Sequence, residues 1–524
     1  MDRRSKHLLI LYFFLTTLTA AVLFSPGFEL TVPYFVGLAL LLSLYLIPIA
    51  ATQFGSLSRA RGVLYLTTTT VVAMLVVIDP VEIGLYGYDP YMHTIPSVEY
   101  MRTGPSLTDF LNREDAWPAF YAGVVLLEEF GLPPLAISKY LPLVAAAAPA
   151  LLYIGLCRTL ENNDAFLVAV GFASTRTLLL FESKFLSESM AVLLLFLIVL
   201  IFLSAPDTKS RSAALFGAVT VLVFTHHAVA AFLIFLLFLW PVTVYILQLP
   251  WIPRRLQPTE DDVTPRFVYG LVAGILFVTL FIDVGSEFAG WLLANLLSAL
   301  EAGQGAAVAG LSGGEASIRG YLTQAALPLF VVCAAVVAAG QFSSRQQPEW
   351  VSGWSAFAGV IATLYAVSLV AGAFVPLDPI RFLIILVPFL MAATVGVLVG
   401  RRAESRSSWR QAAVVVLVVA LVVTQLPAIP AHVLFSDPSE TVIGEGHYSA
   451  PQWAASDWAG TYLSDPLVVF ERGLWIAGGT ADPRERRDEC VDYRVWREDS
   501  GLVRDPSSNT VYSAGPIAVE DCAQ

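Results

Sequence analysis

The sequence is short of charge. Charged residues make up 14% of the 524 residues, hydrophobic residues make up 56%, and the mean hydropathy is +0.70. Soluble globular domains carry about 25% charged residues. Because this deficit extends over nearly the whole chain, it excludes an ordinary soluble protein and predicts an all-α polytopic membrane protein.

Lysine is scarcer still, since only four of the thirty basic residues are Lys. The net charge is −12, and the stretch 431–524 contributes −9 of it through sixteen acidic residues and seven Arg. An acidic, Lys-poor surface resembles that of an extreme halophile. With this charge we expect no nucleic-acid partner.

Two further features are sparse or absent. The chain has four Cys; Cys157 and Cys333 fall in or beside apolar runs and are expected in the core. Cys490 and Cys522 lie in the acidic tail, where a disulfide and two free thiols both remain open. No phosphate-binding loop of the P-loop type is present, which argues against an ATP-driven pump.

Long apolar runs are abundant. A helix needs about 20 apolar residues to cross a bilayer, and the apolar run near the N-terminus, which lacks a clear cleavage pattern, is interpreted as the first span. Thirteen spans are predicted, at 8–25, 33–52, 62–79, 135–157, 164–181, 186–204, 212–226, 229–249, 267–285, 321–340, 354–375, 379–399 and 411–429. The spans 212–226 and 229–249 require a tight turn at His226–His227.

The distribution of Lys and Arg predicts the orientation, because these residues favour cytoplasmic loops. With the N-terminus inside, sixteen lie at inner ends and six at outer ends. This predicts a transmembrane domain over 1–430, with long outer loops at 80–134 and 286–320. The tail 431–524 is predicted to be a small, acidic, mixed α/β domain outside the membrane, with short strands such as PLVVF.

The stretch LYGYDPYMHTIPSVEYM (85–101) interrupts this apolar pattern just outside the third predicted span. Asp89 and His93 are four residues apart, so on a helix they would share a face. A carboxylate and an imidazole at the membrane boundary can bind a metal or exchange a proton. A solvated loop with a turn at Asp89-Pro90 is the alternative.

Charges also occur at the outer end of the fifth predicted span, in STRTLLLFESKFLSES. Arg176 is expected within the membrane, with Glu182 and Glu188 just beyond it. Charges at membrane depth are expensive and usually functional. Snorkelling of Arg176 to the interface is the alternative.

Three more residues are expected on the same outer face. His226 and His227 lie at the predicted turn, in either a substrate-binding or a structural role. Arg381, in FVPLDPIRFLIILVPFL, begins a predicted span and suits a phosphate geometrically, although an interfacial anchor is the alternative. Together with the segment DAWPAFYAG (115–123), these residues predict an outward-facing polar cleft.

These motifs resemble the GT-C superfamily of membrane glycosyltransferases, which use polyprenyl-phosphate sugar donors. The string GYDPYMH is similar to the first outer loop of oligosaccharyltransferase catalytic subunits, and the Glu-bearing loop and DPIRFLIILVPFL add to the resemblance. The polyprenyl-phosphate (dolichyl-phosphate) mannosyltransferases that complete archaeal glycans are similar too. The resemblance covers about residues 60–400.

The sequence departs from oligosaccharyltransferases in three ways. Two N-terminal spans are extra, the tail is small, and the WWDYG motif is absent, with only QWAASDWAG at 452–460. These departures favour transfer of a single sugar over transfer of a whole oligosaccharide.

The resemblance implies roles for the candidate residues. Asp89 would be the general base on the acceptor hydroxyl or, with Glu182 or Glu188, a ligand of a divalent cation such as Mg²⁺ or Mn²⁺. The base role is preferred because the Asp-x-Asp arrangement is lacking. His93 would assist either role.

The same resemblance implies that Arg381 and Arg176 neutralise the leaving phosphate, and that the sugar passes with inversion to a glycan or glycoprotein outside the cell membrane. The competing interpretations are a transporter or lipid-linked-sugar flippase, and a non-catalytic surface scaffold. A transporter would show two related halves with charges near mid-membrane.

Overall fold

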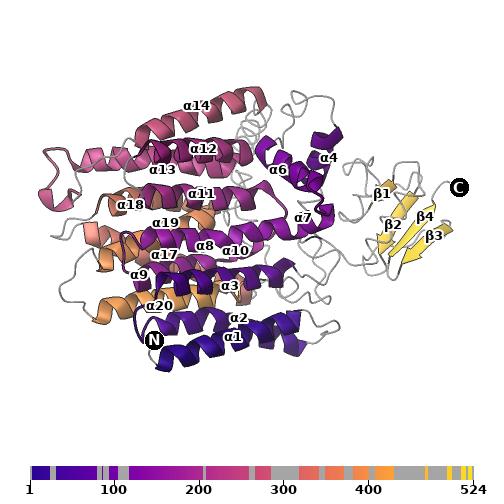
Figure 1. The fold of residues 1–524 in the computed structure, drawn as a ribbon, viewed down its shortest axis with the longest axis horizontal. Helices are drawn as coiled ribbons and strands as arrows, with labels where there is room; N and C mark the ends of the chain where they lie inside the picture. Colours follow the sequence, from indigo (N-terminus) through magenta and orange to yellow (C-terminus); the bar gives the residue numbers. More distant parts are fainter. Residues whose placement is uncertain are drawn as a thin grey trace.

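The protein is mostly helical in the computed structural model (Figure 1). The structure describes residues 3–23, 31–78, 85, 94–103, 117–204, 208–258, 266–284, 318–341, 348–370, 382–399, 408–429, 467–469, 493–497, 509–514 and 517–521. Most helices run side by side along one common direction in this view.

Each predicted span overlaps at least one helix. The helices of the first half are α1 (Arg3–Leu23), α2 (Thr31–Ala51), α3 (Arg59–Ile78), α4 (Ile95–Thr103), α6 (Pro118–Glu129), α7 (Pro134–Tyr140), the 3₁₀ helix η2 (Leu141–Ala147), α8 (Ala148–Leu156), α9 (Asn162–Ala173), α10 (Arg176–Leu180) and α11 (Ser187–Ser204). Those of the second half are α12 (Lys209–Thr225), α13 (His227–Leu247), the 3₁₀ helix η3 (Arg254–Leu256), α14 (Arg266–Val284), α17 (Ile318–Gln341), α18 (Glu349–Val370), α19 (Leu383–Val399) and α20 (Ser408–Gln425).

Within the described residues, three helical segments are long and apolar enough to cross a membrane, namely Arg59–Ile78, Pro134–Leu156 and His227–Leu247. Shorter apolar stretches occur at Lys6–Val22, Phe35–Ala51, Ser187–Leu203, Val268–Thr279, Leu329–Gly340, Leu383–Val399 and Trp409–Gln425. The apolar helices indicate a membrane protein, while the count of thirteen spans and the orientation stay predictions.

The tight turn expected between two predicted spans is present. Thr225 ends α12, and His227 begins α13 directly after the single residue His226. The expected helix pair is therefore confirmed.

The fifth predicted span, 164–181, is not one continuous helix. Ser174 and Thr175 separate α9 from α10, and both are fully buried. Their hydroxyls donate to the carbonyls of Gly171 and Phe172 at 2.9 and 2.8 Å. Side chains of this kind compete with the helical hydrogen-bond ladder, which explains the break.

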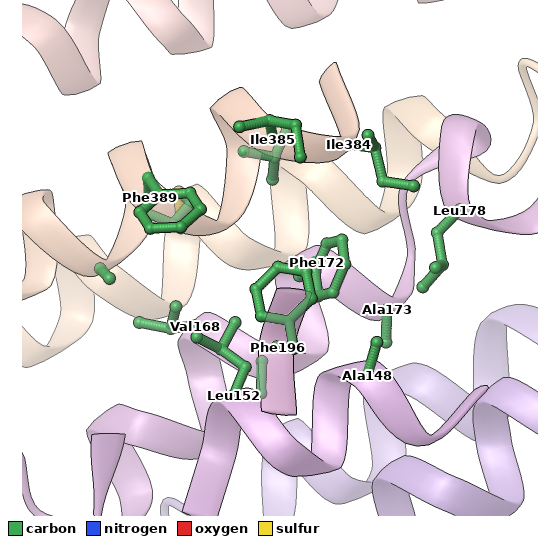
Figure 2. Close-up of a cluster of buried hydrophobic side chains, with 14 of the residues drawn as sticks. Ala148, Leu152, Val168, Phe172, Ala173, Leu178, Phe196, Ile384, Ile385 and Phe389 are labelled. Atoms are coloured by element: carbon green, nitrogen blue, oxygen red, sulfur yellow. The ribbon is translucent and has the colours of Figure 1, made fainter. Parts of the chain in front are cut away.

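Interlocking aromatic rings build the core between the helices (Figure 2). Phe172 of α9 lies 4.8 Å from Phe196 of α11, measured between ring centroids, and Phe196 lies 6.3 Å from Phe389 of α19. Trp354 and Phe357 of α18 enclose Phe389 at 4.8 and 4.9 Å. Rings at such separations favour edge or offset contacts, so these four helices hold one another in register.

Polar side chains also occur at the opposite end of the helices from the candidate site. The side chain of Asn163, at the start of α9, accepts from the amide of Leu57 at 2.8 Å and donates to the carbonyls of Thr52 and Gly55 at 2.9 and 3.0 Å. This end of the helices therefore carries buried polar contacts of its own.

Four strands form a sheet in the tail. They are β1 (Leu467–Val469), β2 (Tyr493–Arg497), β3 (Asn509–Ala514) and β4 (Ile517–Asp521), in the order β1-β2-β4-β3. β1 pairs parallel with β2, and the other pairs are antiparallel. β1 lies within the run PLVVF, where a strand was expected. The extent and the mixed α/β character of the tail domain stay predictions.

Candidate functional site

Three of the eight predicted site residues, Asp89, His93 and Arg381, lie outside the described residues, as do Cys490 and Cys522. The structure describes the other five, which are Arg176, Glu182, Glu188, His226 and His227. Each of these five residues lies at or beside the end of a helix.

A small apolar core lies at the end of the helical body where α4, α6 and α7 gather. Its buried members are Leu85, Val98, Phe120, Tyr121, Val124, Ile137 and Phe185. Apart from Leu85, which precedes α4, they come from α4, α6, α7 and the turn before α11. Figure 1 shows α4, α6 and α7 together at one end of the helices. Arg102 of α4 forms ion pairs with Glu99 and with Glu128 of α6, and the hydrogen bond to Glu128 raises the pKa of Arg102. Leu85 and Val98, described residues before and after Asp89 in the sequence, thus belong to one core with residues of α6 and α7.

The turn 181–186 carries Glu182 and leads directly into α11, whose first turn carries Glu188. The hydroxyl of Ser189, in the first turn of α11, donates to the backbone carbonyls of Glu182 and Lys184 at 3.0 and 3.2 Å. Glu182 is 0% exposed and Glu188, in the same first turn, is 5% exposed. Burying a carboxylate is costly unless its surroundings compensate the charge. The burial of these two carboxylates in an otherwise apolar sequence indicates that they do more than keep the protein soluble.

Arg176 begins α10 directly after the helix break. Its backbone N–H donates to Oε1 of Gln425, the last residue of α20, at 3.3 Å. Close by, the hydroxyl of Tyr45 of α2 donates to the carbonyl of Ala173 at 2.8 Å. Backbone that is not helical at membrane depth needs such partners. Gln425 of α20 therefore holds the Arg176 backbone, and Tyr45 of α2 holds the neighbouring carbonyl of Ala173.

An aromatic stack covers the turn between α12 and α13. The indole of Trp117, which precedes α6, lies parallel to the His227 imidazole with centroids 4.5 Å apart. The His226 ring lies 5.6 Å from Trp117 and 5.0 Å from His227. Nδ1 of His226 also accepts from the amide of Val229 at 3.4 Å, so His226 is the N-cap of α13. An accepting Nδ1 carries no proton, which leaves Nε2–H as the donor.

These features are connected by packing. Phe185, in the turn that carries Glu182, lies 5.8 Å from Phe120 of α6. Trp117 is three residues before Phe120 and contacts the two histidines. The turn 181–186 and the His226–His227 turn thus share α6 as a common neighbour. The two turns thus carry a carboxylate and two imidazoles, and Trp117 adds an aromatic face beside the histidines.

The predicted metal site stays a prediction. Among the described residues there is no group of three or more His, Cys, Asp or Glu side chains placed to hold a metal ion. Glu182, one of its two predicted ligands, is among them, whereas Asp89 is not.

Two residues at this end were not predicted as site residues. The sequence places Trp117 within DAWPAFYAG on the outer face, but it does not predict that the indole stacks on His227. Gln425 is a single amide in the apolar run VVVLVVALVVTQLPAI, and polar residues within predicted spans are usually functional. That rule would have drawn attention to Gln425, although its contact with Arg176 depends on the fold.

Comparisons with known proteins leave the family open. No family model and no curated protein matches the chain. Among solved structures, the oligosaccharyltransferase of Archaeoglobus fulgidus, tethered to an acceptor peptide containing the NVT sequon, is similar with a TM-score of 0.48 and 11% sequence identity. The match covers 79% of this chain and 62% of the length of that protein. A likeness this distant assigns no family.

Proposed function

We propose that the protein is a membrane glycosyltransferase. It moves one sugar, with inversion, from a polyprenyl-phosphate donor to a glycan or glycoprotein outside the cell membrane. The observation that carries the proposal is that buried carboxylates, two imidazoles, an aromatic face and the Arg176 backbone lie at one end of a helical body rich in apolar helices. The sequence resemblance to GT-C enzymes supports the same reading.

The proposed reaction needs one base and one anion-binding group. Asp89 takes the proton from the acceptor hydroxyl as that oxygen forms its bond to the anomeric carbon. The bond from the anomeric carbon to the phosphate oxygen breaks, and the lipid phosphate leaves with the electron pair. Arg381 and Arg176 stabilise the charge that develops on the phosphate. Because the lipid phosphate is already an activated leaving group, no nucleotide is required.

The remaining site residues position the substrates in this proposal. In this proposal, Glu182 or Glu188 joins Asp89 in holding a divalent cation or in orienting the acceptor. The face of Trp117 and the imidazole of His227 form a surface on which a sugar ring can lie. His93 supports Asp89.

The proposal is tested by mass spectrometry of glycans and lipid-linked sugars from a deletion strain of the host. The strain is rescued with the wild-type gene, with Asp89→Ala, or with Glu129→Ala as a matched control. Glu129 is an exposed carboxylate at the end of α6. We expect the deletion and Asp89→Ala strains to lack one sugar, and the wild-type and Glu129→Ala strains to make the complete glycan.

Other outcomes distinguish the alternatives. Loss of all protein glycosylation, with complete lipid-linked glycan accumulating, would indicate an oligosaccharyltransferase. Unchanged glycans in the deletion strain would reject glycosyl transfer and favour a transporter or flippase. Full rescue by Asp89→Ala would remove that residue from the mechanism.

A further inference from the structure

Gln425 carries a buried side-chain amide whose N–H donor has no acceptor within the described part of the chain. The residue is 2% exposed at the end of α20, and its Nε2 has no hydrogen-bond partner among the described residues. The residues around it in sequence are apolar and buried, with Val422, Leu426 and Ile429 at 0% exposure. A buried amide without an acceptor is costly, so such a group calls for an explanation.

The orientation of this amide is determined by its neighbour. The backbone N–H of Arg176 is a donor, so the atom of Gln425 that faces it at 3.3 Å must be the acceptor Oε1. A flipped amide would bring two donors together. Nε2 is therefore directed away from the Arg176 amide, and the planar group cannot rotate without losing that bond.

No described hydroxyl accepts from Nε2 of Gln425. Those of Ser174 and Thr175 each donate to a carbonyl of α9. The hydroxyl of Thr424 donates to the carbonyls of Ala420 and Leu421 within α20. A ligand oxygen would supply the missing acceptor.

We propose that Gln425 is a substrate-binding residue whose Nε2 donates to a phosphate oxygen of the polyprenyl-phosphate ligand. The inference rests on the proposed function for the lipid part of the ligand. Gln425 is anchored to the backbone of Arg176, which begins α10 directly after the helix break. Among the described residues, the Arg176 guanidinium is the positive charge nearest in sequence to this break. A phosphate is therefore favoured over a neutral sugar. Hydrogen bonds to an ionised oxygen are stronger than those to a neutral one.

The test uses the full-length protein in lipid nanodiscs and measures the Kd for polyprenyl monophosphate by native mass spectrometry. The decisive variant is Gln425→Glu. Its carboxylate still accepts from the Arg176 N–H, so the helix clamp is kept, while the N–H donor is replaced by a negatively charged oxygen. We expect the affinity for polyprenyl phosphate to fall at least about tenfold. The affinity for neutral polyprenol should stay the same.

Tyr45→Phe is the matched control. It removes the other long-range hydrogen bond at the same helix break, the one to Ala173, and leaves the amide of Gln425 untouched. We expect its Kd for polyprenyl phosphate to equal that of the wild type. An equal loss in Tyr45→Phe and Gln425→Glu would mean that Gln425 acts through the fold alone, and would overturn the proposal.

Two further outcomes would overturn it: an unchanged Kd in Gln425→Glu, or a wild-type protein that does not prefer polyprenyl phosphate to polyprenol. If Gln425→Glu fails to fold, Gln425→Met, which is similar in size, removes the donor and the Arg176 acceptor together, so an unchanged Kd in that variant would overturn the proposal. Because binding is measured without sugar transfer, the two proposals fail separately. Binding through Gln425 without transfer leaves a lipid-phosphate site on a protein that is not a transferase.

Discussion

His226 illustrates, at the scale of single residues, how a local structural role can coexist with a place in a candidate site. Its Nδ1 caps α13, and its ring also belongs to the stack with Trp117 and His227. The sequence left a structural and a substrate-binding role open. The structure provides the structural role, while a substrate contact stays a prediction.

Substitution can separate these roles. His226→Ala removes the acceptor for the Val229 amide and should lower the stability by about 1 kcal/mol. His226→Asn restores a cap, because Asn is among the preferred N-cap residues, but it has no imidazole. We expect His226→Asn to recover the thermal midpoint of the wild type, measured in detergent.

The glycosylation assay then completes the comparison. A stable His226→Asn protein with normal glycan transfer would limit His226 to the cap. A stable variant with impaired transfer would place the imidazole at the substrate. If neither variant lowered the midpoint, the cap would be unimportant to the fold.

At the scale of elements, the apolar pattern predicted where helices form but not where one is interrupted. The ranges 186–204 and 267–285 match α11 and α14 within one residue at each end. The break at Ser174–Thr175 was missed because hydropathy averages over a window. Its partners, Tyr45 and Gln425, are brought there by packing of α2 and α20, which no local pattern encodes.

Glycine positions set how closely neighbouring helices approach. A Cβ on Gly353 of α18 would lie 2.5 Å from the Trp240 ring of α13, whereas a Cβ on Gly359 of the same helix meets no atom within 4 Å. Gly353→Ala should therefore destabilise the protein by about 1–3 kcal/mol through overpacking. Gly359→Ala should leave stability unchanged or raise it slightly, since Ala favours helix.

Thermal unfolding of both variants in detergent, followed by tryptophan fluorescence, checks this prediction. Equal midpoints for the two variants would contradict the close contact between α13 and α18. The candidate site is remote in sequence from both glycines, so the comparison reports on packing alone.

At the scale of the whole molecule, the helices have two ends with separate polar contacts, and the predicted orientation assigns these ends to opposite sides of the membrane. The turn after α6 exposes Phe130, which is 77% exposed, and the turn after α13 exposes Trp251, which is 72% exposed. These two side chains mark the two ends. The parts of the candidate site outside the described residues, including Asp89, keep the status of predictions.

Cysteine labelling tests the orientation. The native Cys157 and Cys333 are buried, and the tail cysteines are removed by Cys490→Ser and Cys522→Ser. In this background, a membrane-impermeant maleimide should label Phe130→Cys in intact cells and Trp251→Cys only after permeabilisation. The reverse pattern would place the candidate site inside the cell and exclude the proposed external acceptor.

The hydrogen bond between Arg176 and Gln425 joins residues 249 positions apart, which bears on biosynthesis. A ribosome makes the chain from its N-terminus, so α9 and α10 are complete long before α20 exists. During that interval the Arg176 amide has no Gln425 to bond, and the phosphate contact proposed here is incomplete. A nascent chain would thus thread most of its helices into the bilayer before gaining this part of its binding site, which delays ligand capture until synthesis has reached α20.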